Sequence, residues 1–313
     1  MKLKKPKFWD YQKPNFLSYI LLPLTVPIIL NNFFLNLKKK KNGSKKLKKI
    51  CIGNIYVGGT AKTPLTIKIW KILDKLNFKV ATIKKFYKNQ IDEQKILKKE
   101  TKLYCFRSRK KAIDASLNDK LDIIIFDDGL QDHSISYDLK FVCFNNIKWI
   151  GNGLLIPAGP MREKIKSISK YDAVFINGNE KDNSELKLFI KKFNENIEIF
   201  ESFYKPVNIG QFNINEKYVI FSGIGNPESF KETLIKNKFN ICKEIIFPDH
   251  HTYKKNDLDH IKLYAKNLNA KILTTEKDYV KINPNKNDDI RYLKIELNIK
   301  NEEKLIKYLK AKI

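Results

Sequence analysis

The chain has 313 residues, 42% of them hydrophobic, which is enough for one large or two medium domains with a real core. Its formal net charge of +27 does not by itself indicate nucleic-acid binding, because only four of the 61 Lys and Arg residues are arginine and the lysines are spread along the whole chain. The four cysteines lack C-x-x-C spacing, which argues against a zinc or disulfide framework and is typical of a reducing compartment.

The chain opens with an uncharged stretch at 14–37, flanked by lysines at 13 and 38–41. Pro23 and Pro27 would kink a buried helix, which disfavours but does not exclude that interpretation. A cleaved signal peptide is disfavoured because no small-residue cleavage site precedes the lysines. We therefore predict a membrane-anchoring or interfacial helix within 1–40, with the lysines holding the next domain on the cytoplasmic side.

A glycine-rich run, Gly-Asn-Ile-Tyr-Val-Gly-Gly-Thr-Ala-Lys-Thr-Pro at 53–64, lies between a predicted strand at 49–56 and a predicted helix at 65–76. This order is typical of a phosphate-binding loop, in which backbone N–H groups surround phosphates, Lys62 neutralises them and Thr63 ligates Mg²⁺. An ordinary strand–turn–helix junction is the alternative, and Ala61 stands where glycine is usual. The predicted nucleotide-binding residues are Val57, Gly58, Gly59, Thr60, Ala61, Lys62, Thr63 and Pro64.

Further apolar runs alternate with helical segments and predict a largely parallel α/β sheet covered on both faces. The run at 121–126 ends in Asp127 and Asp128, where phosphate-transfer folds place an acidic group beside Mg²⁺. A turn capped by Asp-Asp-Gly is the alternative, and the two carboxylates are not separable at this level. Gln131 lies close enough in sequence to reach the same ligand. The other predicted strands of this region are 78–83, 139–144 and 173–176.

The segment 151–163 is rich in glycine and proline, so it is predicted to be a shaped loop. Arg162 stands out in a lysine-rich chain, because a guanidinium forms a fixed fork suited to phosphate or carboxylate. Glu163 beside it suits a metal or a substrate hydroxyl. A surface Arg-Glu pair fits the spacing equally well.

A second α/β unit is predicted to begin near residue 206. His250 and His251 follow Asp249 in a strand-end loop, an arrangement that indicates a proton-handling site. The predicted organisation is an anchor region at 1–40, a core at 41–205 and a second lobe at 206–313. In an alternative assignment, the last elements of the chain belong to the core. The lobe's predicted strands are 218–222, 243–247 and 271–275, and its predicted helices are 228–237 and 257–267.

Six segments occur in an order that resembles the tetraacyldisaccharide 4′-kinases, which phosphorylate the lipid A precursor. The resemblance spans residues 53–278, and the hydrophobic stretch at 16–37 has its counterpart in the family. It implies an α/β fold: a P-loop NTPase-like three-layer α/β/α core with a second, smaller α/β lobe and an N-terminal hydrophobic helix. The matching segments are 53–64, Asp-Asp-Gly-Leu-Gln-Asp at 127–132, 151–163, Gly-Ile-Gly-Asn-Pro at 223–227, Phe-Pro-Asp-His-His at 247–251 and Thr-Glu-Lys-Asp at 275–278.

The resemblance also implies roles for individual residues. Asp92 would be the catalytic base, assisted by His250, with Lys62 acting on the phosphates. Two motifs of the family are altered: its Ser-Arg-Gly-Tyr is Lys-Lys-Phe-Tyr at 84–87, and the Asp-Glu pair at 92–93 lacks its flanking glycine and proline. The implied metal ligands are Thr63, Asp127, Asp128 and Glu163, and the implied substrate contacts are Asn54, Gln131 and Arg162.

The expected function is ATP- and Mg²⁺-dependent phosphorylation of the 4′-hydroxyl of an acylated glucosamine disaccharide 1-phosphate, the lipid A precursor. The expected place is the cytoplasmic face of the cell inner membrane, with an anionic membrane surface as partner and with no nucleic acid and no obligate protein partner. One alternative is a membrane-associated P-loop ATPase acting on a protein, although Val57 stands where such ATPases often carry lysine. Another is a nucleic-acid-binding module with salt-sensitive affinity, which the scarcity of arginine disfavours.

Overall fold

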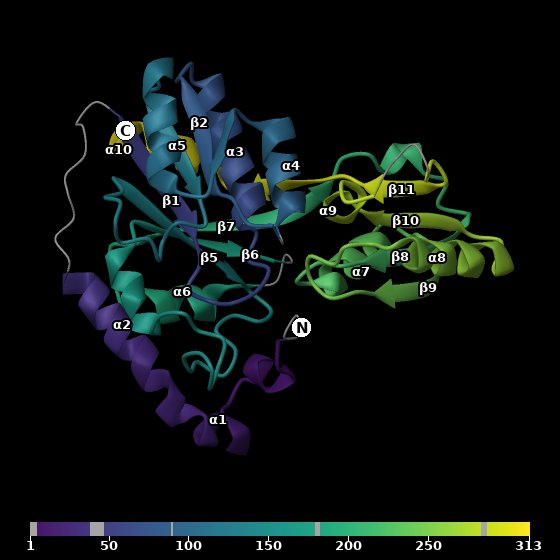
Figure 1. The fold of residues 1–313 in the computed structure, drawn as a ribbon, viewed down its shortest axis with the longest axis horizontal. Helices are drawn as coiled ribbons and strands as arrows, with labels where there is room; N and C mark the ends of the chain where they lie inside the picture. Colours follow the sequence, from purple (N-terminus) through teal and green to yellow (C-terminus); the bar gives the residue numbers. More distant parts are fainter. Residues whose placement is uncertain (1–4, 38–46, 89, 179–181, 283–286) are drawn as a thin grey trace. The chain divides into compact units, whose positions relative to one another are not determined.

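The computed structural model describes residues 5–37, 47–88, 90–178, 182–282 and 287–313, and the chain divides into two compact units (Figure 1). Unit 1 consists of Met1–Lys85, Thr101–Phe203 and Leu297–Ile313, and unit 2 consists of Phe86–Glu100 and Tyr204–Glu296. The sequence analysis placed domain boundaries near residues 40 and 206 and left open a return of the last elements to the core. The contacts group the C-terminal segment with unit 1, and they group the segment with Asp92, which no predicted boundary set apart, with unit 2.

Within the described residues, unit 1 is built on an eight-stranded sheet of order β12-β7-β6-β5-β1-β4-β2-β3 (Figure 1). Neighbours from β7 to β3 are parallel. Bonds from Lys300 N to Glu201 O and from Val207 N to Lys294 O make β12 antiparallel to β7, so the sheet is mixed. The strands are β1 Lys48–Gly53, β2 Val80–Lys85, β3 Leu103–Phe106, β4 Ile123–Asp127, β5 Leu139–Asn145, β6 Ala173–Asn177, β7 Glu198–Pro206 and β12 Ile295–Ile299.

Helices cover both faces of this sheet. On one face, Val142 and Phe144 of β5 pack in one core cluster with Ile190 of α6. On the other, the rings of Phe141 and Phe200 meet Tyr308 of α10. All five residues of β4 and of β6 are buried, as expected for strands in the middle of three layers. The helices of unit 1 are α1 Phe16–Ile20, α2 Val26–Leu37, α3 Lys62–Lys75, α5 Arg109–Ser116, α6 Ser184–Lys191 and α10 Glu302–Lys312, with 3₁₀ turns η1 Lys7–Asp10, η2 Leu22–Thr25, η3 Leu117–Asp119 and η4 Ile165–Lys170.

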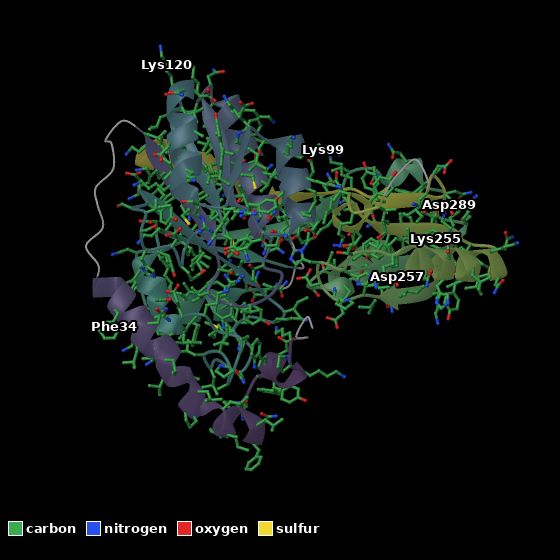
Figure 2. The ribbon with its side chains drawn as sticks, in the orientation of Figure 1. Phe34, Lys99, Lys120, Lys255, Asp257 and Asp289 are labelled. Carbon is green, nitrogen blue, oxygen red and sulfur yellow. The ribbon has the colours of Figure 1, made fainter. Side chains whose placement is uncertain are left out.

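Unit 2 has, within the described residues, a four-stranded parallel sheet of order β11-β10-β8-β9. One core cluster gathers Tyr218, Ile220 and Leu273, and another gathers Val219, Phe221 and Ile272, so β8 is buried from both sides. Lys99 of α4, labelled in Figure 2, pairs with Glu276 at 2.8 Å. The elements are β8 Lys217–Ser222, β9 Asn240–Ile246, β10 Lys271–Thr275, β11 Ile290–Leu293, α4 Ile91–Glu100, α7 Pro227–Lys236, α8 Lys255–Asn267, α9 Glu276–Tyr279 and η5 Ile209–Gln211.

The predicted elements are present, and their ends shift for local reasons. The strand predicted at 49–56 ends at Gly53, because the chain there turns and Tyr56 forms only an isolated bridge with Met161. The helix predicted at 65–76 begins at Lys62, because Leu65 N donates to Ala61 O at 2.9 Å and closes a first turn. The strand predicted at 271–275 has the same bounds as β10.

The N-terminal segment of unit 1 buries two small polar residues and exposes many of its large apolar ones. Ser18 and Thr25 are buried, and Asn152 Nδ2 donates to Ser18 Oγ at 3.0 Å. Exposed side chains include Phe34 of α2, labelled in Figure 2. In the described part of the chain, no helix is both long enough and apolar enough to span a bilayer. The exposed apolar residues of this segment are Phe16, Leu17, Tyr19, Ile20, Leu24, Val26, Leu30 and Phe34.

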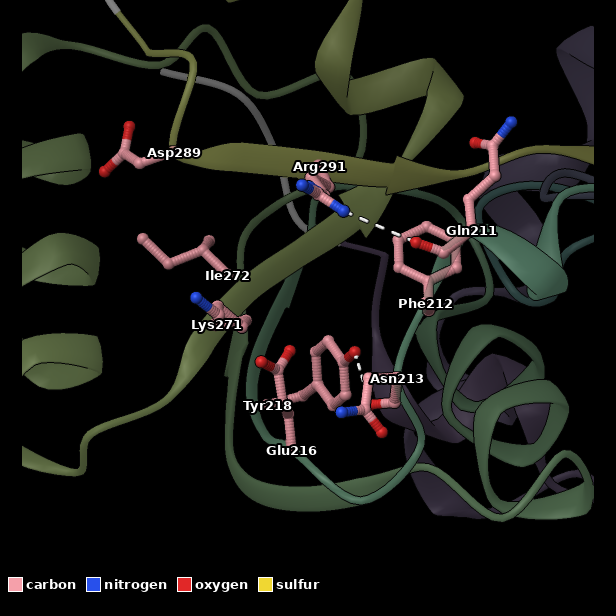
Figure 3. A pocket seen from close by; sticks show the side chains of 9 residues that line it. All are labelled: Gln211, Phe212, Asn213, Glu216, Tyr218, Lys271, Ile272, Asp289 and Arg291. Atoms are coloured by element: carbon pink, nitrogen blue, oxygen red, sulfur yellow. Dashed lines mark hydrogen bonds between the residues drawn. The ribbon is translucent and has the colours of Figure 1, made fainter.

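Unit 2 also contains a cavity of about 240 Å³ at the amino ends of β8, β10 and β11 (Figure 3). Tyr218 donates its hydroxyl to Asn213 O at 2.8 Å, and Arg291 donates to Gln211 O at 3.4 Å. Lysine, arginine, aspartate and glutamate side chains all line it, so its charge favours no single ligand class. The histidine loop follows the carboxyl end of β9 and therefore lies at the opposite edge of this parallel sheet.

Candidate active site

The loop between β1 and α3 is shaped by its own side chains. A Cβ added at Gly53 would lie 2.6 Å from Leu130 Cγ, so only glycine fits where the strand turns. Asn54 is fully buried and donates through Nδ2 to Tyr56 O at 2.5 Å and to Thr60 Oγ1 at 2.9 Å. This amide braces the loop from inside, and the predicted contact of Asn54 with substrate stays a prediction.

The amino end of α3 has the backbone geometry of an anion-binding site. Ala61 adopts the left-handed conformation, with φ 65° and ψ 22°, and occupies the N-cap position. This is the position at which the sequence has alanine in place of the usual glycine, and a non-glycine residue there costs roughly 1–2 kcal/mol. The first turn of a helix leaves N–H groups without partners inside the helix, and Lys62 and Thr63 supply such groups here.

Two side chains from different elements donate hydrogen bonds to Asp127, the last residue of β4. Thr63 Oγ1 of α3 donates to Asp127 Oδ2 at 2.9 Å. Lys84 Nζ of β2 donates to the same oxygen at 2.7 Å, and the Lys84 and Asp127 side chains are only 2% and 0% exposed. Asp127 Oδ1 is buried and has no hydrogen-bond partner among the described residues. Lys84 was not among the predicted site residues, and nothing in the sequence distinguishes it from Lys85 beside it.

Asp128 turns the chain away from the strand and faces two cations. It has φ 60°, a conformation that aspartate tolerates better than most residues. Lys62 Nζ lies 3.6 Å from Asp128 Oδ2, and Arg162 donates to Asp128 Oδ1 at 3.2 Å. Arg109 of α5, which is buried, donates to the Asp128 carbonyl and to Asp132 Oδ2, the latter at 3.0 Å. The sequence analysis missed Arg109, although it is one of only four arginines in the chain.

The glycine- and proline-rich loop brings Arg162 and Glu163 to the same cluster. Arg162 donates to Gln131 Oε1 at 3.2 Å, and Gln131 Nε2 donates to Glu163 Oε1 at 2.9 Å. Tyr171 donates its hydroxyl to Glu163 Oε2 at 3.0 Å. Burial, with the charge of Glu163 adding to it, raises the pKa of Tyr171 well above its usual value, so it acts as a neutral donor. Both oxygens of Glu163 are thus hydrogen-bonded, and its predicted role as a metal ligand stays a prediction.

The residues at the end of β4 fit a magnesium ion that is carried by a nucleotide. Among the described residues, no three His, Cys, Asp or Glu side chains form a group able to hold a metal ion. Mg²⁺ in phosphate-transfer sites is usually held by one or two protein groups together with phosphates and waters. The Thr63 hydroxyl and the unpartnered Asp127 Oδ1 are groups of that kind.

In unit 2, the structure brings Asp92 and His250 together from segments 158 residues apart. Asp92 lies in the first turn of α4 and is 1% exposed. His250, in the loop after β9, places Nδ1 3.0 and 2.9 Å from the two carboxylate oxygens of Asp92. His251 does not reach this pair, because its Nε2 lies 3.0 Å from Asp257 and its ring stacks on Phe247.

Two lysines of the Thr-Glu-Lys-Asp region also face Asp92. Lys277 Nζ lies 3.8 Å and Lys281 Nζ 3.9 Å from Asp92 Oδ2. Burial raises the pKa of Asp92, but the His250 hydrogen bond and the Lys277 charge outweigh it and hold that pKa below the ordinary 3.8. Asp92 is therefore ionised at neutral pH and held in a fixed orientation.

The chain was compared with known proteins and structures. A family model described as tetraacyldisaccharide-1-P 4′-kinase matches residues 19–313. The tetraacyldisaccharide 4′-kinase of Pelagibacter ubique (strain HTCC1062) is 50% identical over 306 residues, covering 97% of this chain and 96% of that protein. That of Rickettsia bellii (strain OSU 85-389) is 34% identical over 318 residues, covering 96% of each.

A solved structure supports the fold. The "apo" form of LpxK from Aquifex aeolicus, in complex with ATP, superposes with a TM-score of 0.71 at 21% sequence identity, covering 95% of this chain and 99% of that chain. Together with the helix-covered sheets described above, this likeness confirms the predicted α/β fold class.

The Asp92–His250 pair makes a prediction about acid stability. Because the folded-state pKa of Asp92 is lowered, its ionised form contributes stability that is fully present above the ordinary pKa of 3.8 and is lost as pH falls through the lower folded-state value. His250→Asn, which tolerates the left-handed φ of 56°, removes the largest favourable contact and moves acid unfolding to higher pH. Circular dichroism during acid titration measures this shift. His251→Asn is the matched control, and an equal shift in both variants would contradict the assignment.

Proposed function

Because the chain belongs to the tetraacyldisaccharide 4′-kinase family, we infer that it transfers the γ-phosphoryl group of ATP to the 4′-hydroxyl of an acylated glucosamine disaccharide 1-phosphate in lipid A biosynthesis. The observation that carries this inference beyond the family match is the Thr63–Asp127 hydrogen bond, which joins the end of the glycine-rich loop to the acidic end of β4. In P-loop phosphoryl-transfer enzymes, a Ser or Thr of the loop and an aspartate at a strand end hold the magnesium ion of the nucleotide.

The nucleotide is proposed to bind at residues 57–64. The free N–H groups at the amino end of α3 and the Lys62 ammonium group complement its phosphates. In the structure Lys62 and Arg162 both face Asp128 and are partly exposed, so they are available to turn toward phosphate oxygens. Thr63 and Asp127 are the groups that would hold Mg²⁺, which when bound neutralises the β- and γ-phosphates.

The chain's own residues account for the rest of the reaction. As the 4′-hydroxyl oxygen forms its bond to the γ-phosphorus, the bond from that phosphorus to the ADP oxygen breaks, and Asp92 accepts the hydroxyl proton. His250 orients the Asp92 carboxylate through its Nδ1 contacts. Lys62 and Arg162 stabilise the charge on the transferring group. A low pKa makes Asp92 a weak base, which suits a loose transition state in which the proton moves late.

The N-terminal segment is proposed to lie in the membrane interface on the cytoplasmic face of the inner membrane. Large apolar side chains of α1, η2 and α2 are exposed, while the polar side chains of Ser18 and Thr25 are buried. A helix with one apolar and one polar side lies in the plane of the interface. The net charge of +27 favours an anionic surface and an anionic lipid substrate.

Lys62→Ala tests the nucleotide site. The variant is expected to lose roughly 100-fold or more in turnover, because charge stabilisation by one preorganised donor contributes that much. The assay incubates enzyme, ATP and the acylated disaccharide 1-phosphate, and mass spectrometry measures the new phosphomonoester. Lys75→Ala, at the exposed end of the same helix, is the control and is expected to keep full turnover. Undiminished turnover of Lys62→Ala would remove the loop from the mechanism.

Asp92→Asn tests the base. It is expected to lower kcat by roughly 100-fold or more while the affinity for ATP stays unchanged, because general-base catalysis contributes on that scale. Steady-state kinetics give kcat, and calorimetric titration with ATP gives the affinity. Asp259→Asn on the exposed side of α8 is the matched control. A change in KM alone would exclude Asp92 as the base.

The double variant Ile20→Asn/Leu24→Asn tests the membrane assignment. Burial of each aliphatic side chain is worth about 1.5–3 kcal/mol, so affinity for anionic phospholipid vesicles is expected to fall by at least about tenfold. Co-sedimentation with vesicles measures it. Leu188→Asn removes an equally exposed leucine from α6 and is expected to change nothing. Equal loss in the control would show that the N-terminal segment is not the contact surface.

A further inference from the structure

Lys84 has no assigned role in the reaction proposed above, although it is paired with Asp127 in the protein interior. Lys84 on β2 lies opposite Asp127 on β4 in the parallel register, and its Nζ donates to Asp127 Oδ2 at 2.7 Å. Neither side chain is more than 2% exposed.

The ammonium group of Lys84 changes what Asp127 is able to bind. Asp127 Oδ2 already accepts from both Lys84 and Thr63, so only Oδ1 is left without a partner among the described residues. A divalent cation at Oδ1 would share one carboxylate with a fixed positive charge. Inside a protein this repulsion is much stronger than in water, because the surroundings screen charge poorly.

A buried lysine is also costly to leave unpaired, so Lys84 keeps its place when no metal is bound. Breaking a buried ion pair by removing one partner typically destabilises by several kcal/mol. Asp127 is therefore oriented by Lys84 and Thr63 before any ligand arrives. A serine in the same position would supply a hydrogen bond but no charge.

We propose that Lys84 is a positioning residue that holds Asp127 in its binding orientation without a metal and keeps a divalent cation from settling there until nucleotide phosphates bring it. The cation then enters as part of the metal–nucleotide complex, because the phosphate charge offsets the repulsion from Lys84. This inference rests on the proposed function in that it assumes that the loop at 57–64 binds ATP.

The test measures Mn²⁺ binding to the nucleotide-free full chain by electron paramagnetic resonance. Lys84→Gln removes the charge but keeps an N–H donor for Asp127, and Lys84→Ser removes the charge and leaves a small hydroxyl side chain. Both variants are expected to bind Mn²⁺ at least about tenfold more tightly than the wild type, equivalent to about 1.4 kcal/mol. Glutamine fills more of the space of the lysine side chain than serine does. If Lys84→Ser is unstable, the Mn²⁺ affinity of folded Lys84→Gln still tests the role of Lys84.

The matched control is Lys85→Ser. It lowers the net charge by the same amount, but neighbouring residues of a strand point to opposite faces, so it leaves Asp127 untouched. Unchanged Mn²⁺ affinity in folded Lys84→Gln, or an equal gain in Lys85→Ser, would overturn the proposal. Tight Mn²⁺ binding to the nucleotide-free wild type would overturn it as well.

A second arm separates this inference from the proposed function. Each protein is titrated with a non-hydrolysable ATP analogue plus Mn²⁺, and thermal shift reports nucleotide binding. Wild-type protein is expected to bind Mn²⁺ much more tightly with the analogue than without it. Failure of the analogue to bind any variant would contradict the kinase assignment, whereas the nucleotide-free comparison of Lys84→Gln with wild type would still decide the role of Lys84.

Discussion

The buried carboxylate of Asp127 joins three elements of unit 1, because side chains of α3 and β2 donate hydrogen bonds to it at the end of β4. It accepts hydrogen bonds from Thr63 in the first turn of α3 and from Lys84 near the end of β2. Its own strand, β4, lies between β1 and β2. Because all three strands are parallel, their carboxyl ends meet at one edge of the sheet. The glycine-rich loop also leaves β1 at that edge, so the fold itself brings this loop beside an acidic strand end.

Asp92 in unit 2 is a buried carboxylate of a different kind. One oxygen of Asp127 accepts hydrogen bonds from a lysine and a hydroxyl, and its other oxygen has no partner among the described residues. Both oxygens of Asp92 contact His250, and two lysines form longer ion pairs with it. Both carboxylates are ion-paired, as buried charges generally must be. The unpartnered oxygen leaves Asp127 able to accept a ligand, whereas the His250 contacts fix the orientation of the Asp92 carboxylate.

The loop at 151–163 connects the N-terminal segment with the cluster formed by Arg162, Gln131 and Asp128. Trp9 Nε1 donates to Pro157 O at 2.9 Å, and Asn152 N donates to Trp9 O at 3.1 Å. A Cβ at Gly151 would lie 2.0 Å from Trp9 O, and this residue also has φ +56°, so only glycine fits. Farther along, Asn32 Nδ2 donates to the Arg162 carbonyl at 3.1 Å. The segment with the exposed apolar surface therefore contacts the same loop that carries Arg162 and Glu163.

The sequence by itself determined the glycine-rich loop, the acidic strand end, the apolar strands and the family, because these depend on the spacing and type of residues close in the chain. It also paired Asp92 with His250, but only through the resemblance, since nothing local links positions so far apart. Tertiary structure alone decided that Lys84 faces Asp127, that Arg109 secures the Asp128 turn, and that the segment with Asp92 belongs with residues 204–296. Each of these depends on strand register or on long-range packing, which place residues together without leaving a periodic signal in the sequence.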